Sequence, residues 1–252
     1  MMATLTILRH GKSIWNKEKR FTGWTDVALS PRGIAEAKQA GQLLKARGVT
    51  FDLCFTSYLN RAIETLRLVL DTMNLSHVPI QKDWRLNERH YGELQGLDWW
   101  EATRKYGAKQ VLIWQRHFDV PPPPLDVTDT RFPAHDPLYS HLSPADLPQS
   151  ESLKDTLARL LPFWHDVAIP ELRQGKHLLI VAHNNSLRGL LKHLDSISDV
   201  DISNITIRTA DPMLYELNEK IVPIPREYLR PRSTFSQFAQ KIFGHWIRTI
   251  SR

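Results

Sequence analysis

The chain has 252 residues, of which 42% are hydrophobic, and this is enough for one large α/β domain with a substantial core. Its net charge is +6, but the basic residues are spread along the chain without a nucleic-acid-binding motif, so we expect no nucleic-acid partner. No apolar run approaches the ~20 residues of a membrane span, the first apolar run begins too close to Met1 for a signal peptide, and Cys54 is the only cysteine, so we predict a cytoplasmic protein.

The first apolar run, Leu5 to Leu8, ends in Arg9-His10-Gly11. This pattern predicts a buried strand that delivers its last side chains to the carboxyl edge of a sheet. Arg binds phosphoryl oxygens with a planar fork, Gly lets backbone N–H groups approach, and His is a nucleophile near neutral pH. A structural histidine at a strand end explains these three residues equally well when they are taken alone.

Helical and extended patterns alternate after this strand. Ser30-Pro31 is a favourable helix start, with Ser as N-cap and Pro in the first turn. Arg61 opens a second helix directly after a strand, so it either points toward the same edge as Arg9 or is an ordinary surface charge. The predicted elements are an exposed loop over 17–25, a helix from Ser30 to Gly48, a strand over 49–55, a helix from Asn60 to Asn74 and a short strand over 78–80.

The second half contains a polar segment, a long insertion and another buried strand. We interpret residues from about 98 to 149 as an insertion that forms a lid, because a long Pro-rich loop inside a compact domain is usually functional. The run Leu178–Ala182 predicts a buried strand, and His183 follows it as His10 follows the first. Two strands that each end in His favour a shared site. The other predicted elements are a polar loop over 87–92, helices over 98–107 and about 109–117, a helix from Ser152 with a kink at Pro162, a helix over 185–194, an edge pair of strands over 213–217 and 221–224, and an amphipathic helical tail over 230–252.

Four separated segments resemble the motifs of the cofactor-dependent phosphoglycerate mutases, within the histidine phosphatase superfamily. They are Arg9–Asn16, Phe21–Ser30, Asn87–Gly92 and Ala182–Arg188, and the resemblance runs from about Leu5 to Leu229. It implies one catalytic domain over 4–229 with a phosphoglycerate mutase-like α/β fold, a three-layer α/β/α sandwich around a mostly parallel sheet with an antiparallel edge.

Phosphoryl transfer needs a nucleophile, positive charge on the phosphoryl oxygens and an acid for the leaving oxygen. We assign His10 as the nucleophile, Arg9, Arg61 and His183 as the charge clamp, and Glu88 as proton donor and acceptor. A salt bridge to a neighbouring Arg is the structural alternative for Glu88. No metal is expected, because these side chains supply the positive charge. The resemblance implies priming by 2,3-bisphosphoglycerate, and it places substrate-binding residues at Ser13, Asn16, Thr22, Gly23, Tyr91, Arg116 and Asn185. Arg89, His90 and Asn184 lie within the same motifs, and we predict that they bind substrate as well.

The chain departs from the family pattern on the substrate side. Trp99 stands where a Lys is usual, Gln115 replaces the first of an Arg pair, and Asn184 replaces a Gly. We predict interconversion of 2- and 3-phosphoglycerate, and the missing charges keep a phosphatase for a small phosphorylated metabolite as the alternative. A non-catalytic phospho-ligand-binding protein is less favoured, because His10, Glu88 and His183 are all present. A homodimer or a homotetramer is compatible with the sequence.

Overall fold

The computed structural model describes residues 3–218 and 227–228. Within these residues the chain forms one six-stranded sheet in the order β3-β2-β4-β1-β5-β6. The strands from β3 to β1 are parallel, and β5 and β6 continue the sheet in antiparallel pairs. The predicted strand over 221–224 and the predicted tail over 230–252 lie outside the described residues. The strands are β1 (Thr4–Arg9), β2 (Leu53–Thr56), β3 (Ile80–Lys82), β4 (Leu178–Ala182), β5 (Met213–Glu216) and β6 (Glu227–Tyr228).

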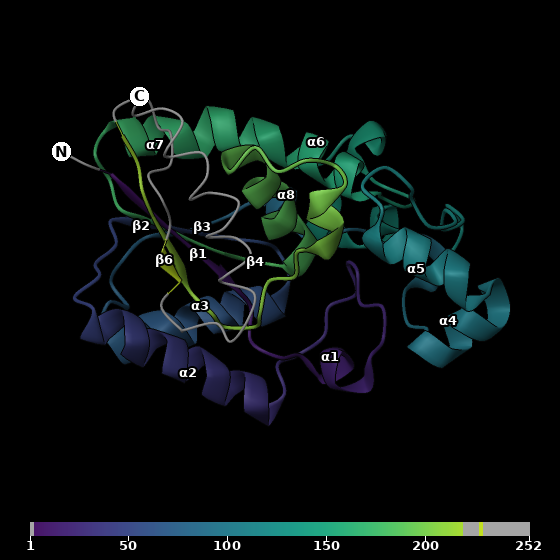
Figure 1. The fold of residues 1–252 in the computed structure, drawn as a ribbon, viewed down its shortest axis with the longest axis horizontal. Coiled ribbons are helices and arrows are strands. Elements are labelled where there is room, and N and C mark those ends of the chain that lie inside the picture. The colour runs from purple at the N-terminus through teal and green to yellow at the C-terminus, as the bar shows by residue number, and fades with distance from the viewer. Residues whose placement is uncertain (1–2, 219–226, 229–252) are drawn as a thin grey trace, which may run out of the picture.

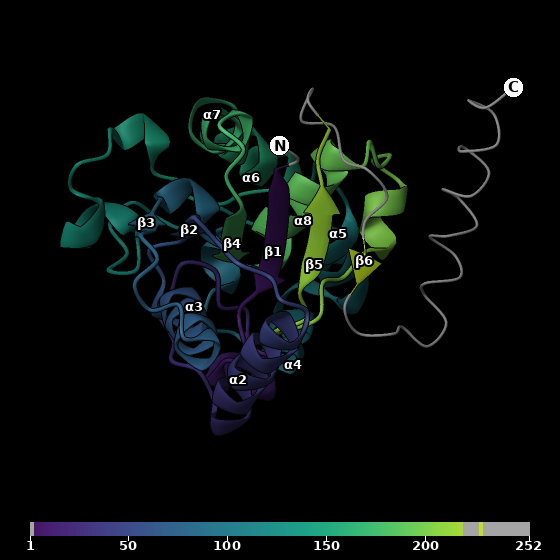
Figure 2. The same cartoon turned by 90° about the vertical axis from the view of Figure 1, so that its left-hand side faces the viewer.

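Helices cover both faces of the sheet, as the predicted three-layer sandwich requires. Figures 1 and 2 show α2 and α3 below the sheet and α6, α7 and α8 above it. Successive side chains of a strand point to opposite faces. Accordingly, Ile180 packs into the core under α6 and α8, while its neighbours Leu179 and Val181 pack against α2 and α3. The main helices are α2 (Pro31–Ala46), α3 (Asn60–Met73), α6 (Leu153–Phe163), α7 (Ile169–Arg173) and α8 (Asn184–Leu194).

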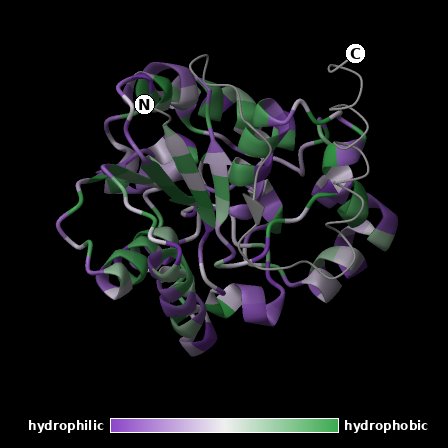
Figure 3. Ribbon diagram, turned by 60° about the vertical axis from the view of Figure 1, so that its left-hand side comes forward, coloured by the Kyte–Doolittle hydropathy of each residue, from purple (hydrophilic) through white to green (hydrophobic). Residues whose placement is uncertain are grey.

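The helix boundaries follow the capping residues that the sequence provides. Ser30 accepts a hydrogen bond from the Gly33 N–H at the start of α2, and Ser152 forms a capping box with Asp155 at the start of α6. Beyond Pro162, the hydrogen-bonding pattern changes from α to π over Trp164–Ala168 before α7 begins. Figure 3 shows hydrophobic colours along the central strands and hydrophilic colours on outward helix surfaces. None of the helices among residues 3–218 is long and apolar enough to span a membrane.

Two strand predictions were wrong in their limits. Strand β2 begins at Leu53 rather than Val49, because Asp52 exchanges hydrogen bonds with His177 and ends the preceding loop. The apolar side chains of Val49 and Phe51 pack against the α2 and α3 core without joining the sheet. Strand β3 pairs over Ile80–Lys82, whereas Val78 lies before it, at the end of a turn, and packs into the same core. Before β2 and before β3, the apolar residues therefore indicate burial in the core, but they do not indicate pairing with a neighbouring strand.

The insertion has a small core of its own. Its helices α4 (Trp99–Tyr106) and α5 (Ala108–Arg116) pack around Phe21, Leu94 and Val111, beyond the carboxyl ends of the strands (Figure 1). Residues 121–149 contain only three short 3₁₀ turns. A further short helix, α1 (Ile14–Glu18), was not predicted and reaches into the segment expected to be a loop. Segment 17–25 is thereby held between the sheet and the insertion, since Arg20 forms a β-bridge with Asp98.

Candidate active site

The pairing of β1 with β4 brings the two strand-end histidines together. Arg9 lies opposite Ala182 in this parallel pair, so His10 and His183 leave the sheet side by side. Their ring centroids are 4.9 Å apart, and the His10 N–H donates to the Ala182 carbonyl over 2.9 Å. Both side chains are buried. The parallel sheet therefore builds the shared site that the sequence pattern predicted.

One nitrogen of His10 is committed to the backbone. Its Nδ1 lies 2.7 Å from the Gly11 carbonyl oxygen, which can only accept, so Nδ1 carries the proton and Nε2 keeps its lone pair. Burial, followed by the charges of Arg61 and Arg9, holds the pKa of His10 well below its usual value. His10 is therefore neutral at physiological pH, which is the state a nucleophile needs.

Buried Arg61 and half-buried Arg9 supply the positive charge around His10. Arg61 donates to the carbonyl oxygens of Gly23 and Thr25, and Arg9 donates to the Ile207 carbonyl over 2.6 Å, while its buried Nε has no partner among the described residues. Burial lowers the pKa of Arg61 to about 10, so this guanidinium stays charged at neutral pH. Because carbonyl dipoles alone do not neutralise these charges, the site favours an anion.

His183 is neutral in the ligand-free protein. Burial, Arg61, His10 and Arg9 together hold its pKa well below the usual value. Its Nε2 is 2.7 Å from the Ser57 hydroxyl, and its buried Nδ1 has no partner within the part of the chain that the structure describes. His183 can therefore join the predicted clamp as a hydrogen-bonding group, and it gains a proton only when bound negative charge favours the imidazolium.

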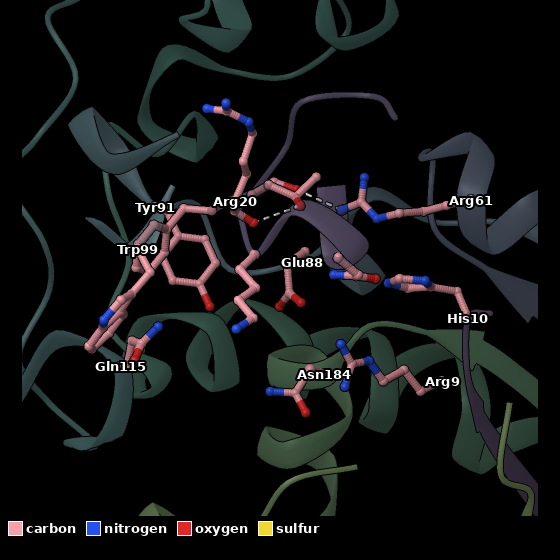
Figure 4. Close-up of a pocket in the computed structure, with 14 residues that line it drawn as sticks. Arg9, His10, Arg20, Arg61, Glu88, Tyr91, Trp99, Gln115 and Asn184 are labelled. Atoms are coloured by element: carbon pink, nitrogen blue, oxygen red, sulfur yellow. Dashed lines mark hydrogen bonds between the residues drawn. The ribbon is translucent and has the colours of Figure 1, made fainter. Parts of the chain in front are cut away.

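Glu88 lies between His10 and Tyr91 (Figure 4). Its Oε1 accepts the backbone N–H groups of Arg89, over 2.8 Å, and Asn185, over 3.0 Å. Its Oε2 has no hydrogen-bond partner among the described residues. Since Oε1 already accepts two donors, a proton carried by Glu88 belongs on Oε2. The salt bridge considered as a structural role for Glu88 is absent from the part of the chain that the structure describes.

Arg9, His10, Arg61 and Glu88 open onto a cavity of about 340 Å³, whereas His183 lies behind His10 and is not part of its lining. Figure 4 shows Arg9, His10 and Arg61 at one end and Tyr91, Trp99 and Gln115 at the other. The cavity therefore has a basic end at His10 and a remote end on the insertion side. Its complete lining is Arg9, His10, Asn16, Lys19, Arg20, Phe21, Thr22, Gly23, Arg61, Glu88, Tyr91, Trp99, Gln115 and Asn184.

Residues 5–220 match the family model of the histidine phosphatase superfamily, branch 1. The chain belongs to this superfamily. Enzymes of the superfamily are phosphatases and mutases, and the fold of this member agrees with solved structures of both kinds.

Three solved structures illustrate this likeness, each at 22% identity to the superfamily member described here. A mycobacterial glucosyl-3-phosphoglycerate phosphatase has a TM-score of 0.65, over 84% of this chain and 92% of its own. An α-ribazole phosphatase from Shigella flexneri has a TM-score of 0.64, over 88% and 94%. A phosphoglycerate mutase from Bacillus anthracis has a TM-score of 0.63, over 88% and 91%. At this identity the likeness establishes the fold.

Several predicted substrate-binding residues of this superfamily member lie outside the cavity lining. Ser13 is buried and caps α1 by accepting from the Asn16 N–H. His90 is buried, accepts from the Gly92 N–H, and has its pKa lowered to about 3, chiefly by burial and then by Arg159. Arg116 is exposed and donates to the Ser203 carbonyl over 3.3 Å. Arg89 and Asn185 are buried behind Tyr91, with Arg89 over its ring and Asn185 bonded to its hydroxyl.

Lys19, Arg20 and Phe21 line the cavity but were not predicted from the sequence as site residues. Lys19 has a left-handed backbone (φ 59°) that ends α1, and its side chain forms no ion pair among the described residues. Arg20 contacts Glu18, Glu101 and the Gly96 carbonyl, and Figure 4 shows its guanidinium directed away from His10. A basic loop close to the first motif was the only available signal. Trp99, Gln115 and Asn184 do line the cavity, so the departures from the family pattern lie within the site.

Proposed function

We propose that this protein interconverts 3-phosphoglycerate and 2-phosphoglycerate through a phosphohistidine at His10, primed by 2,3-bisphosphoglycerate. The observation that carries this proposal is the form of the cavity, where a neutral His10 with a free Nε2 stands between Arg9 and Arg61 at one end of a longer pocket. The remote end has room and polar groups for a second anionic group of the substrate. Such a metabolic activity belongs in the cytoplasm, the compartment that the single cysteine favours.

The residues divide the reaction between them. From the phosphohistidine, the 2-hydroxyl oxygen of 3-phosphoglycerate attacks the phosphorus, the bond from phosphorus to His10 Nε2 breaks, and Glu88 Oε2 takes the hydroxyl proton. Nε2 then attacks the 3-phosphoryl group of the bisphosphate, the bond from that phosphorus to O3 breaks, and Glu88 returns the proton to O3, which leaves 2-phosphoglycerate and the phosphohistidine. Arg9, Arg61 and His183 stabilise the charge on the transferring group.

The cavity fits the proposed primer at both ends. Arg9 and Arg61 can hold one phosphate beside His10, while Lys19 and Asn184 line the cavity and are suited to the rest of the molecule. When bound, 2,3-bisphosphoglycerate would supply the phosphoryl group that His10 must carry before the first turnover. Arg9 Nε is buried without a partner, as expected of a group that awaits an anion.

The first experiment mixes the protein with 3-phosphoglycerate, with and without 2,3-bisphosphoglycerate, and follows 2-phosphoglycerate and inorganic phosphate by ³¹P NMR. We expect 2-phosphoglycerate to form faster with the primer. His10→Ala should abolish it, while His165→Ala, which changes an exposed histidine in the π-helical segment after α6 and outside the cavity lining, should leave the rate unchanged. Absence of 2-phosphoglycerate under both conditions would overturn the proposal.

A phosphatase is the second candidate, and the neutral side chains of Trp99 and Gln115 favour it. A charge-assisted contact is worth roughly 1.5–3 kcal/mol, so loss of two such contacts speeds the escape of the bisphosphorylated intermediate by about two orders of magnitude if nothing compensates. Phosphate release without formation of 2-phosphoglycerate, in the same ³¹P NMR experiment, would identify the protein as a phosphatase.

Restoring the usual basic residues provides a second test of substrate recognition. In the double variant Trp99→Lys, Gln115→Arg, we expect a lower KM for 3-phosphoglycerate and less phosphate released per transfer, because positions 99 and 115 line the remote end of the cavity. Steady-state kinetics of the double variant and of the wild type measure both quantities. An unchanged KM together with negligible phosphate release by the wild type would show that the two substitutions are neutral.

A further inference from the structure

Two buried guanidinium groups lie behind the remote end of the cavity. Arg89 and Arg188 are 1% and 3% exposed, and neither forms an ion pair among the described residues. Arg89 donates to the Trp114 carbonyl, and its guanidinium lies 4.6 Å from the centre of the Tyr91 ring, while its Nε and one terminal nitrogen have no partner in residues 3–218. Burial of positive charge without a counter-ion is costly unless an anion is bound nearby. This part of the protein therefore carries unbalanced positive charge.

The two guanidinium groups are close enough to influence each other. Burial, and after it the charge of Arg89, lowers the pKa of Arg188 to about 10, which leaves it charged at neutral pH. Glu88 and Tyr91 act on it in the opposite direction, but Glu88 Oε1 already accepts two backbone N–H groups. Neither guanidinium lines the cavity, so each can act on a ligand only through the residues in front of it.

A chain of hydrogen bonds connects Arg188 to the cavity wall. Its Nη1 donates to Asn185 Oδ1 over 2.8 Å, and Asn185 Nδ2 donates to the Tyr91 hydroxyl oxygen over 3.0 Å. Arg can only donate, so it determines which end of the Asn185 amide is the oxygen. Tyr91 Oη must then accept from Asn185, and its own proton is left to point elsewhere. Tyr91 lines the cavity, so this O–H is available to a ligand.

We propose that Arg188 is a positioning residue that, through Asn185, makes Tyr91 a hydrogen-bond donor to a carboxylate at the end of the substrate remote from His10. The charges of Arg89 and Arg188 also make this end favourable for an anion, in place of the basic residues missing at Trp99 and Gln115. This inference rests on the proposed function only in assuming that the phosphate of the substrate lies beside His10.

Two ligands that differ at the remote group test the proposal. 3-Phosphoglycerate and glycerol 3-phosphate share a phosphate and a three-carbon skeleton, but the second has a hydroxymethyl group where the first has a carboxylate. Titration calorimetry of both compounds requires no turnover. We expect the wild type to bind 3-phosphoglycerate more tightly, and Arg188→Met to weaken this binding about tenfold or more while glycerol 3-phosphate changes less than about twofold.

Lys192→Met is the matched control, because it removes a positive charge from the same helix at a residue that bonds Ile197 and Asp199 and does not line the cavity. Its preference for the carboxylate should equal that of the wild type. Arg188 also donates to the Ile202 carbonyl, so thermal unfolding of each variant checks the fold. If Arg188→Met does not fold, Arg188→Lys provides the same comparison, since Lys keeps the charge but cannot reproduce both hydrogen bonds.

Tyr91→Phe separates the hydrogen-bonded chain from a general effect of charge. If Arg188 acts through Tyr91, Arg188→Met combined with Tyr91→Phe should weaken 3-phosphoglycerate binding far less than the sum of the two single changes. Fully additive effects, or an Arg188 variant that keeps the preference for the carboxylate, would overturn the inference and leave the proposed function intact. A wild type that binds neither compound would contradict both.

Discussion

The chemistry of the site depends on which atoms of His10 and Glu88 remain free. His10 Nδ1 is bonded to the Gly11 carbonyl, and Glu88 Oε1 accepts two backbone N–H groups. Among the described residues, His10 Nε2 and Glu88 Oε2 have no hydrogen-bond partner. In the proposed mechanism these two atoms react, and because backbone contacts hold both side chains before substrate binds, little reorganisation is needed.

Glu88→Gln tests this assignment because the amide keeps an oxygen for the two N–H groups but cannot exchange a proton. We expect the fold to be retained and single-turnover phosphoryl transfer from His10 to slow by roughly 10²–10⁴-fold. Rapid-quench measurements give the rate. Glu93→Gln is the control, since that carboxylate bonds Lys105 and Tyr106 outside the cavity. A Glu88 variant with a near-normal rate would remove this residue from the mechanism.

At the scale of elements, α6 positions the segment that carries Glu88. The Arg159 side chain, 7% exposed, pairs with Glu151 and donates to the carbonyl oxygens of Arg85 and Asn87. Trp24 donates to the Glu88 carbonyl over 2.6 Å, and the Arg159 guanidinium lies 5.5 Å from its ring. The loop is thus held from α6 and from segment 17–25, although it contains no regular secondary structure before Gly92.

The start of α2 holds the turn that follows His10 in place. Gly11 and Gly33 let the backbones approach so closely that a Cβ on Gly33 would lie 2.2 Å from the Lys12 carbonyl oxygen. Ser30 donates to that same oxygen through its N–H and its hydroxyl. The helix start and the turn after His10 are therefore packed as one unit.

Gly33→Ala should consequently destabilise the protein by about 1–3 kcal/mol or more and reduce transfer at His10, because backbone atoms must move apart. Gly189→Ala is a matched change in α8, where the nearest atom to an added Cβ is 3.5 Å away, an ordinary contact. It should leave stability unchanged or raise it by about 0.5–1 kcal/mol. Denaturant unfolding measures both variants. Equal effects of the two changes would contradict the close approach as the cause.

For the whole molecule, burial of several histidines makes stability depend on pH. His10, His90 and His183 come from three distant segments, and burial lowers the pKa of each. Below pH 6.5 the unfolded chain takes up protons that these folded residues do not. The unfolded state is then favoured, so stability is lost as the pH falls from about 7 toward the lowered values.

His90 offers the clearest measurement because its pKa is about 3 and it lies outside the cavity. Between pH 7 and pH 5 it should account for about 2 kcal/mol of lost stability. His90→Gln should reduce that loss by the same amount, whatever its own stability at pH 7. Urea unfolding at both pH values tests this, with exposed His77→Gln as the control that should keep the wild-type loss.

The sequence by itself determined the features that depend on residues adjacent in the chain, namely the strands, the helix caps and the residues that follow each strand. The apolar runs of β1 and β4, the caps at Ser30 and Ser152, and the histidine after each central strand follow from local patterns. Because parallel strands end at the same edge of a sheet, these patterns were sufficient to predict the α/β/α sandwich and the proximity of His10 to His183.

Only the tertiary structure decided which polar residues face the cavity. Arg89 and Asn185 lie behind Tyr91, Arg116 lies outside, and Lys19 lies in the wall. Equally, the apolar residues before β2 pack into the core and do not extend the sheet. The physical reason is that burial and hydrogen bonding depend on segments brought from elsewhere in the chain, whereas residue type and spacing report only local conformation.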